Sequence, residues 1–526
     1  MKKILYTFAV LFCFHQTIAQ VPEDALRMSW NSPSGTARQQ AIGGAMGSLG
    51  GEISSIFVNP AGLGLYKTGE IVLSPGFSFL KSKGQFRGTD ATADKLSKFN
   101  FGTSGFVYGY NNRYGKWTSA AFSIAVNRTA NFNSSTLYKG ANDYSSFTEP
   151  LSNEFFDYYT QRRNADPTVS NRRIIDDALD EASISLQTKM ALYTYLIDVD
   201  TSNGQNKVIS RAEQVGIVDQ QNKSTSSGGI TEIAFGFAGN MDDKLYIGGS
   251  LGVPIVNYQR NSMYSESDGT GSNNNNFGSA SYHEDYSVKG LGLNVKLGLI
   301  FKPADFVRIG LGIHSPTLYG LKDNVSTKLV TDVEQLFGSG KGVDSVNSEV
   351  FYNGQSPEFK YDLISPWKIM VSGSYVLHEV NDVSKQKGFI TADIEYVTHK
   401  SSKYSSAEEN GDNSYYNGVN TAIKSVYKNA FNFRVGGELK FKTIMTRLGF
   451  ALFGRPYQES ALKARRMNIS GGLGYRNKGI FVDLAYVHSL NRDVNFPYRV
   501  ESPRENTFAD LKDNNGNVLL TVGFKF

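Results

Sequence analysis

The chain has 526 residues, of which 40% are hydrophobic and 13% aromatic, and it carries a formal net charge of +5. It contains no run of 18 apolar residues and its mean hydropathy is −0.32, which excludes a helical membrane protein. The numbers of basic and acidic residues are nearly equal, which does not indicate nucleic-acid binding.

Residues 1–19 have the pattern of a secretory signal peptide. Two lysines after Met1 are followed by an apolar run from Ile4 to Phe14 and by Ala19 at the expected cleavage point. The single cysteine, Cys13, lies inside this run, so we expect an exported chain without a thiol. That excludes disulfides, zinc-thiolate sites and cysteine nucleophiles.

Residues 20–68 are rich in glycine and alanine and show no alternation of apolar and polar residues. They precede the first predicted strand. We therefore expect this segment to lie inside the domain formed by residues 69–526 or to hang below it.

Alternation with a period of two runs through residues 69–526. In one segment, apolar residues at every second position from Leu291 to Leu299 are separated by small or polar residues. Such segments number about fourteen, an even count typical of bacterial outer-membrane barrels. They lie near 70–80, 100–110, 117–132, 230–241, 244–257, 282–302, 305–318, 359–378, 388–402, 429–442, 444–454, 467–476, 479–491 and 516–526.

The connections between these segments alternate in length. Short polar turns such as Asp242-Asp243 and Asn477-Lys478 alternate with long connections at 81–99, 133–229, 258–281, 319–358, 403–428, 455–466 and 492–515. Outer-membrane barrels have short periplasmic turns and long external loops. The pattern predicts that both termini face the periplasm.

The longest connection, 133–229, contains a predicted helical stretch from Asn171 to Tyr195. Apolar residues recur there at spacings of three and four, and aromatic residues lie upstream. An apolar stripe in an external loop must pack against something. It either packs on the loop's own aromatic residues or forms with them a groove for an acyl chain, and we favour the groove. Its candidate ligand contacts are Phe155, Phe156, Tyr159, Ile175, Leu179, Leu186 and Met190.

Charged residues fall on the strand face that would point into the lumen. We expect them to form a paired network, because an unpaired buried charge is costly. Two of the arginines, 434 and 447, could alternatively bind a ligand carboxylate. The candidate lumen charges are Asp393, Glu395, Arg434, Glu438, Arg447 and Asp483.

The last ten residues, Asn517 to Phe526, alternate strictly and end on an aromatic residue. Together with the signal peptide and the turn pattern, they predict an all-β fold, a transmembrane antiparallel barrel of about fourteen strands. A soluble propeller or sandwich is the rival, but it would show no asymmetry of turns. We expect Val295→Arg on the lipid face to be far more harmful than Gly298→Ser in the lumen.

Several motifs resemble those of the outer-membrane long-chain fatty acid and hydrocarbon transporters, in a Bacteroidetes-like version. The most specific is the family's hatch motif, here Asn59, Pro60, Ala61, Gly62 and Leu63, preceded by Gln40-Ala-Ile-Gly-Gly-Ala-Met46. Further motifs in the family order include Gly312-Ile-His-Ser-Pro316, Ser365-Pro-Trp-Lys368 and Phe433-Arg-Val-Gly-Gly-Glu438. The resemblance implies a fourteen-strand barrel plugged by residues 20–68, capture of a hydrophobic ligand by outer loops, and lateral exit at an irregular strand. The predicted third strand contains no glycine or proline to mark that exit.

The sequence thus favours passive outer-membrane transport of hydrophobic or amphipathic small molecules, such as long-chain fatty acids. An alternative is an accessory barrel that holds or shuttles secreted proteins, as in type IX secretion, and a third is an outer-membrane lipase. No metal spacing, phosphate loop or nucleophile elbow is found, and we expect neither a cofactor nor an enzyme. The expected partners are outer-membrane lipids, a hydrophobic ligand and the barrel-assembly machinery, with no nucleic acid.

Overall fold

The computed structural model describes residues 22–526 apart from 31–33, 113–114, 203, 339–341, 379–386, 409–410 and 502–503. The predicted signal peptide, residues 1–19, lies outside the described residues. No helix in the described part of the chain is both long enough and apolar enough to cross a membrane.

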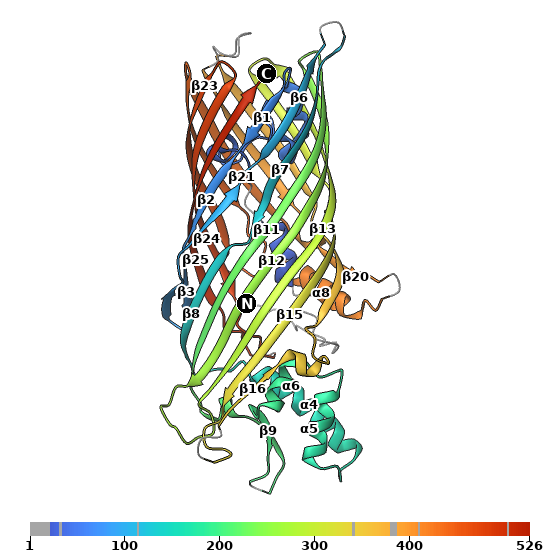
Figure 1. Cartoon of the computed structure of the whole chain (residues 1–526), viewed down its shortest axis with the longest axis vertical. Coiled ribbons are helices and arrows are strands. Elements are labelled where there is room, and N and C mark those ends of the chain that lie inside the picture. Colours follow the sequence, from blue (N-terminus) through green and yellow to red (C-terminus); the bar gives the residue numbers. More distant parts are fainter. Residues whose placement is uncertain are drawn as a thin grey trace, which may run out of the picture.

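Fourteen antiparallel strands form one closed barrel (Figure 1). The barrel closes where Glu70 in the first strand pairs with Lys525 in the last. Eight wall strands are continuous, namely β11 (Val218–Met241), β12 (Leu245–Asp268), β13 (Ser279–Ala304), β21 (Ala430–Phe441), β22 (Ile444–Phe453), β23 (Arg465–Asn477), β24 (Ile480–Asn495) and β25 (Ala509–Lys525).

The other six wall strands are built from shorter pieces. The first comprises β1 (Glu70–Leu73), β2 (Pro75–Leu80) and β3 (Ser82–Phe86), the second β4 (Thr89–Thr92), β5 (Leu96–Phe101) and β6 (Ser104–Asn111), and the third β7 (Trp117–Asn131) and β8 (Ser134–Asn142). The seventh comprises β14 (Val307–His314) and β15 (Leu318–Asp332), the eighth β16 (Val343–Asn347), β17 (Glu358–Ile364) and β18 (Lys368–Leu377), and the ninth β19 (Gly388–Val397) and β20 (Lys403–Ser406).

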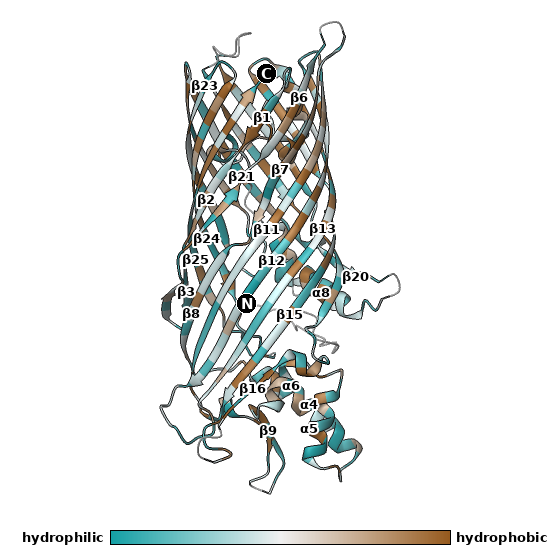
Figure 2. Cartoon of the chain, in the orientation of Figure 1, coloured by the Kyte–Doolittle hydropathy of each residue, from teal (hydrophilic) through white to brown (hydrophobic). Residues whose placement is uncertain are grey.

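An apolar belt surrounds one half of the barrel, the upper half in Figure 2. On β13 every second side chain from Leu291 to Phe301 is apolar and lies on the outer surface. On the same face beyond the belt, Lys289 and Asp285 are exposed. About ten residues of a tilted strand cross the hydrocarbon layer, so the belt matches one membrane thickness. The C-terminus lies at the belt end of the barrel (Figure 1).

The long strands continue well beyond the belt. β12 extends to Asp268 and β13 starts at Ser279, although residues 258–281 were predicted to be a loop. β15 likewise occupies much of the predicted loop 319–358. The prediction was wrong because the outer face turns polar beyond the belt, toward the barrel end opposite the C-terminus, as at Asn257, where alternation no longer indicates a strand. We call the side of the belt toward this end above the belt, although it lies below the belt in Figure 1.

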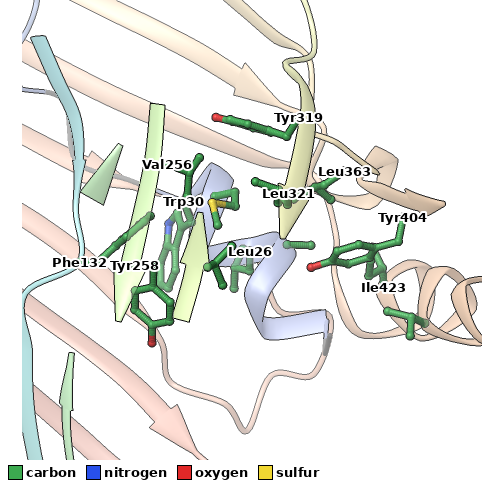
Figure 3. Packing of buried hydrophobic residues seen from close by; sticks show 14 of the residues in the cluster. Leu26, Trp30, Phe132, Val256, Tyr258, Tyr319, Leu321, Leu363, Tyr404 and Ile423 are labelled. Atoms are coloured by element: carbon green, nitrogen blue, oxygen red, sulfur yellow. The ribbon is translucent and has the colours of Figure 1, made fainter. Parts of the chain in front are cut away.

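Residues 22–68 lie inside the lumen rather than below the barrel. They form four short helices, α1 (Pro22–Ser29), α2 (Ala37–Ala41), α3 (Ser55–Val58) and the 3-10 helix η1 (Pro60–Leu65). In Figure 3, Leu26 and Trp30 of the α1 segment lie between wall residues such as Tyr258 and Tyr404. We call residues 22–68 the hatch. It fills the lumen at the level of the belt, and α1 projects toward the loop end.

Residues 143–217 form a helical outer domain at the opposite end from the C-terminus (Figure 1). Its elements are α4 (Glu149–Ala165), α5 (Asn171–Asp180), α6 (Leu186–Tyr193), β9 (Ile197–Asp200), β10 (Lys207–Ser210) and α7 (Arg211–Gln214). The single predicted helix 171–195 is thus two helices, because Ser185 caps α6 by accepting a hydrogen bond from the Thr188 N–H. The other loop elements are η2 (Ser348–Phe351), η4 (His399–Ser401) and α8 (Ser414–Val426).

Candidate transport site

The hatch motif is tied to the wall through the side chain of Asn59. Its Oδ1 accepts from the Ala61 N–H at 3.2 Å, which caps η1 behind Pro60. Its Nδ2 donates to three carbonyl oxygens: Gly47 of the hatch at 2.6 Å, Leu299 at 3.2 Å and Leu311 at 3.3 Å. One amide therefore joins two turns of the hatch to β13 and β14.

Wall glycines give the hatch room to approach. A Cβ at Gly298 would lie 1.8 Å from Asn59 Oδ1, so a serine there would displace the hatch motif. The predicted difference between Val295→Arg and Gly298→Ser is therefore expected to be smaller than the facing of the two residues alone implies. Val295, by contrast, is on the outer surface as expected, with 43% of its side chain exposed.

Five of the six candidate lumen charges form two buried groups. Glu438 Oε2 and Asp483 Oδ1 each accept from the guanidinium of Arg447 at 2.6 Å. Hatch residue Arg38 joins this group through Nε, 3.3 Å from Glu438 Oε2. In the second group, Glu395 accepts from Arg434 Nη2 at 2.6 Å.

The sixth charge, Asp393, bonds to the hatch backbone. Its Oδ2 accepts from the N–H groups of Met46 and Gly47 at 3.0 and 3.2 Å, and its Oδ1 accepts from Ser372 at 2.6 Å. All six candidate charges therefore have partners in the wall or the hatch. Both arginines, 434 and 447, form ion pairs with wall carboxylates.

A cavity of about 2540 Å³ lies above the hatch, between α1 and the outer domain. Its lining mixes aromatic and polar side chains. Members of this lining on the wall strands include Asn100, Phe101, Phe132, Tyr258, Ser262 and Tyr264. This volume exceeds that of a typical site for a small molecule, and the mixture of side chains suits an amphipathic ligand.

The barrel wall is incomplete beside this cavity. Within the described residues, β6 and β7 pair only up to Ser104 and Val126, β5 pairs only with β2, and β7 beyond Val126 pairs only with β11. A register shift between Ile230 and Thr231 marks a bulge in the β7–β11 ladder at the same height. We call the unpaired interval between β5 and the residues 127–134 the seam.

The seam opens from the cavity and is bounded above and below. Seam residues Phe101, Asn131 and Ser134 line the cavity. Above the seam the wall closes again where Phe86 of β3 packs on Tyr138 of β8, with ring centroids 5.4 Å apart. The seam is therefore a stretch of wall without strand pairing, at the edge of the belt nearest the outer domain.

A hatch segment occupies the inner side of the seam. Ser34 Oγ donates to Asn127 Oδ1 at 2.8 Å and also bonds to the Arg128 carbonyl oxygen. A Cβ at Gly102 would lie 2.2 Å from the Gly35 carbonyl oxygen, so the hatch backbone lies directly against β5 and β6. The hatch, which fills the lumen, thus also covers the inner side of the seam.

The seven candidate ligand contacts in loop 133–229 lie elsewhere. Phe155, Tyr159, Leu186 and Met190 are buried in the core of the outer domain, Ile175 and Leu179 pack against that core, and Phe156 is exposed. None of the seven is among the described residues that line the cavity. Their neighbours Leu151, Glu154 and Ser185 do line it.

The outer domain is anchored to the wall by Glu266, on β12 above the belt. Its carboxylate accepts from the Phe147 N–H, from Gln220 and from Tyr264 at 2.6 to 2.9 Å. Burial raises the pKa of the Glu266 carboxyl to about 7, although the hydrogen bonds partly offset that shift. This buried anchor was not predicted, because polar residues on both faces of β12 hide its facing in the sequence.

A closed fourteen-strand barrel with an apolar belt and an internal hatch defines an outer-membrane β-barrel protein. Among the described residues, no group of histidine, cysteine or acidic side chains could hold a metal ion. No protein-family model and no curated protein matches the chain.

Solved structures share the fold. A Pseudomonas aeruginosa FadL homologue is 13% identical and aligns over 94% of this chain and 99% of its own, with a TM-score of 0.54. A TodX monoaromatic hydrocarbon channel mutant is also 13% identical over 94% and 99%, with a TM-score of 0.50. The Ralstonia pickettii toluene transporter TbuX is 14% identical over 94% and 100%, with a TM-score of 0.48. At these identities the likeness to the first two structures shows the fold alone, and it does not support a Bacteroidetes origin.

Proposed function

We propose that the protein is a member of the FadL-like transporters and carries hydrophobic or amphipathic small molecules, long-chain fatty acids among them, across the outer membrane. The observation that carries this proposal is the cavity of about 2540 Å³ that reaches the seam above the hatch. A straight path to the periplasm is filled by buried hatch residues such as Ile42 and Ile53. The seam is therefore the exit that we propose for the ligand.

The physical chemistry of the path fits such a ligand. Burying apolar surface yields about 25 cal/mol per Å², so a long acyl chain can be held without any charged contact. The seam borders the belt, where the exposed rings of Phe99 and Phe101 pack edge to face with their centroids 4.8 Å apart. A molecule that leaves there enters the hydrocarbon layer without crossing water.

Filling the cavity is expected to weaken binding. Ser262 on β12 lines the cavity, so Ser262→Trp should lower the affinity of purified protein for labelled oleate by about tenfold, equivalent to 1.4 kcal/mol. The matched control is Asn261→Trp on the exposed face of the same strand, which should bind as the unaltered protein does. Equal affinities for both variants would contradict the use of this cavity, and co-purification of a secreted protein with empty cavities would favour the shuttle alternative.

A further inference from the structure

The arginines that line the cavity differ in their partners. Five of them pair with carboxylates, and the five pairs are Arg27 with Asp24, Arg260 with Glu284, Arg466 with Asp493, Arg499 with Glu23 and Arg504 with Glu149. The sixth, Arg128, has no ion pair with any described residue. It is also the one that lies at the seam.

The guanidinium of Arg128 is held in place by the backbone. Its Nη2 donates to the Gly228 carbonyl oxygen. A Cβ at Gly229 would lie 2.7 Å from Nη2 and 2.8 Å from Nε, so the group rests against this glycine. The Nε atom is buried and has no hydrogen-bond partner within the described chain. Arg128 is thus a partly buried positive charge without an anionic partner among the described residues.

The position of Arg128 matches the headgroup level of the membrane. On the outer face of β7 the exposed residues Ile124 and Val126 belong to the belt, and Arg128 is at the next outward position. The apolar ring of Phe101 lies across the seam and shares the cavity lining with Arg128. An acidic group bound at Arg128 would thus have its apolar chain directed into the belt.

We propose that Arg128 binds the carboxylate of a single-chain amphipathic anion during its passage through the seam. This inference rests on the proposed transport function and narrows its substrate class to acids over neutral hydrocarbons. The guanidinium group can donate two parallel hydrogen bonds to the two oxygens of a carboxylate. A hydroxyl group has one oxygen and cannot accept such a pair.

The test is competition between two ligands that differ only in the headgroup. Purified protein in a neutral detergent is incubated with equal amounts of oleate and oleyl alcohol, and the retained molecules are quantified by mass spectrometry. We expect about tenfold more acid than alcohol to be retained, the ratio for one charge-assisted hydrogen bond. Arg128→Gln should retain both equally, and Arg128→Lys should keep part of the preference.

The control is Lys223→Gln, which removes an exposed charge on β11 that does not line the cavity, and it should leave the ratio unchanged. Heat-modifiable migration on gels verifies that each variant is folded. Equal retention of both ligands by the unaltered protein, or an undiminished acid preference in Arg128→Gln, would overturn the carboxylate site while leaving transport intact. Retention of neither ligand would instead contradict the proposed function. Stronger Arg128-dependent retention of oleoyl lysophosphatidate would assign the site to a membrane-lipid phosphate and overturn the carboxylate assignment.

Discussion

Replacing Arg447 by methionine is expected to destabilise the folded barrel by about 3–5 kcal/mol, because it removes the ion-pair partner of buried Asp483 and leaves buried Glu438 with Arg38 alone. The Arg447 side chain is 0% exposed, and its partners Glu438 and Asp483 are each 1% exposed. The measurement is the free energy of unfolding by denaturant in detergent. Since Arg38 of the hatch also contacts Glu438, we expect the hatch to become more sensitive to protease in the same variant.

The matched control is Arg172→Met on α5, where the arginine side chain is 74% exposed and pairs with Asp176. Surface pairs contribute at most about 1 kcal/mol, so this variant should unfold like the original protein. Similar losses in the two variants would mean that the lumen network is solvated.

Val295→Arg is expected to cost about 2–4 kcal/mol, because it places a charge near the middle of the lipid-facing belt. Ser287→Arg is the control, since Ser287 lies on the same face of β13 above the belt. We expect the control to fold with normal yield into lipid vesicles and Val295→Arg to fold poorly. Equal folding yields would contradict the assignment of Val295 to the belt and of Ser287 to the part of β13 outside it.

The strands of the barrel wall within the belt could be predicted from the sequence. From Leu291 to Leu299 one face of the strand is turned to lipid and the other to the lumen. Apolar residues therefore alternate with small or polar ones, and the alternation shows which face each residue is on. The hatch motif could be placed through its resemblance to family motifs. The hydrogen bonds from Asn59 to Leu299 and Leu311 could not be predicted, because they end on backbone carbonyls, which every residue has.

The features above the belt could not be predicted for a physical reason. The outer face of a strand is polar there, and the buried inner face of β15 mixes polar with apolar residues, as at Asp323, Val325 and Thr327. The apolar alternation is therefore weak, and the segment resembles a loop. The apolar spacing from Ile175 to Met190 correctly indicated helices, but the same spacing fits a closed core and an open groove. The seam is a property of pairing between strands, and Arg128 differs from other arginines only by the partners it lacks.

The most direct test of the account is to fix the hatch across the seam. Ser34 Oγ and Asn127 Oδ1 are 2.8 Å apart, so we choose this contact for the double variant Ser34→Cys/Asn127→Cys, in which loss of both free thiols on oxidation verifies the disulfide. The only other cysteine is Cys13, in the predicted signal peptide. Uptake of labelled oleate is measured in cells that lack their own fatty acid transporter. We predict that the oxidised variant binds oleate but carries it only at the background rate, and that a reductant restores uptake. Transport at the unaltered rate by the fully oxidised protein would contradict exit through the seam.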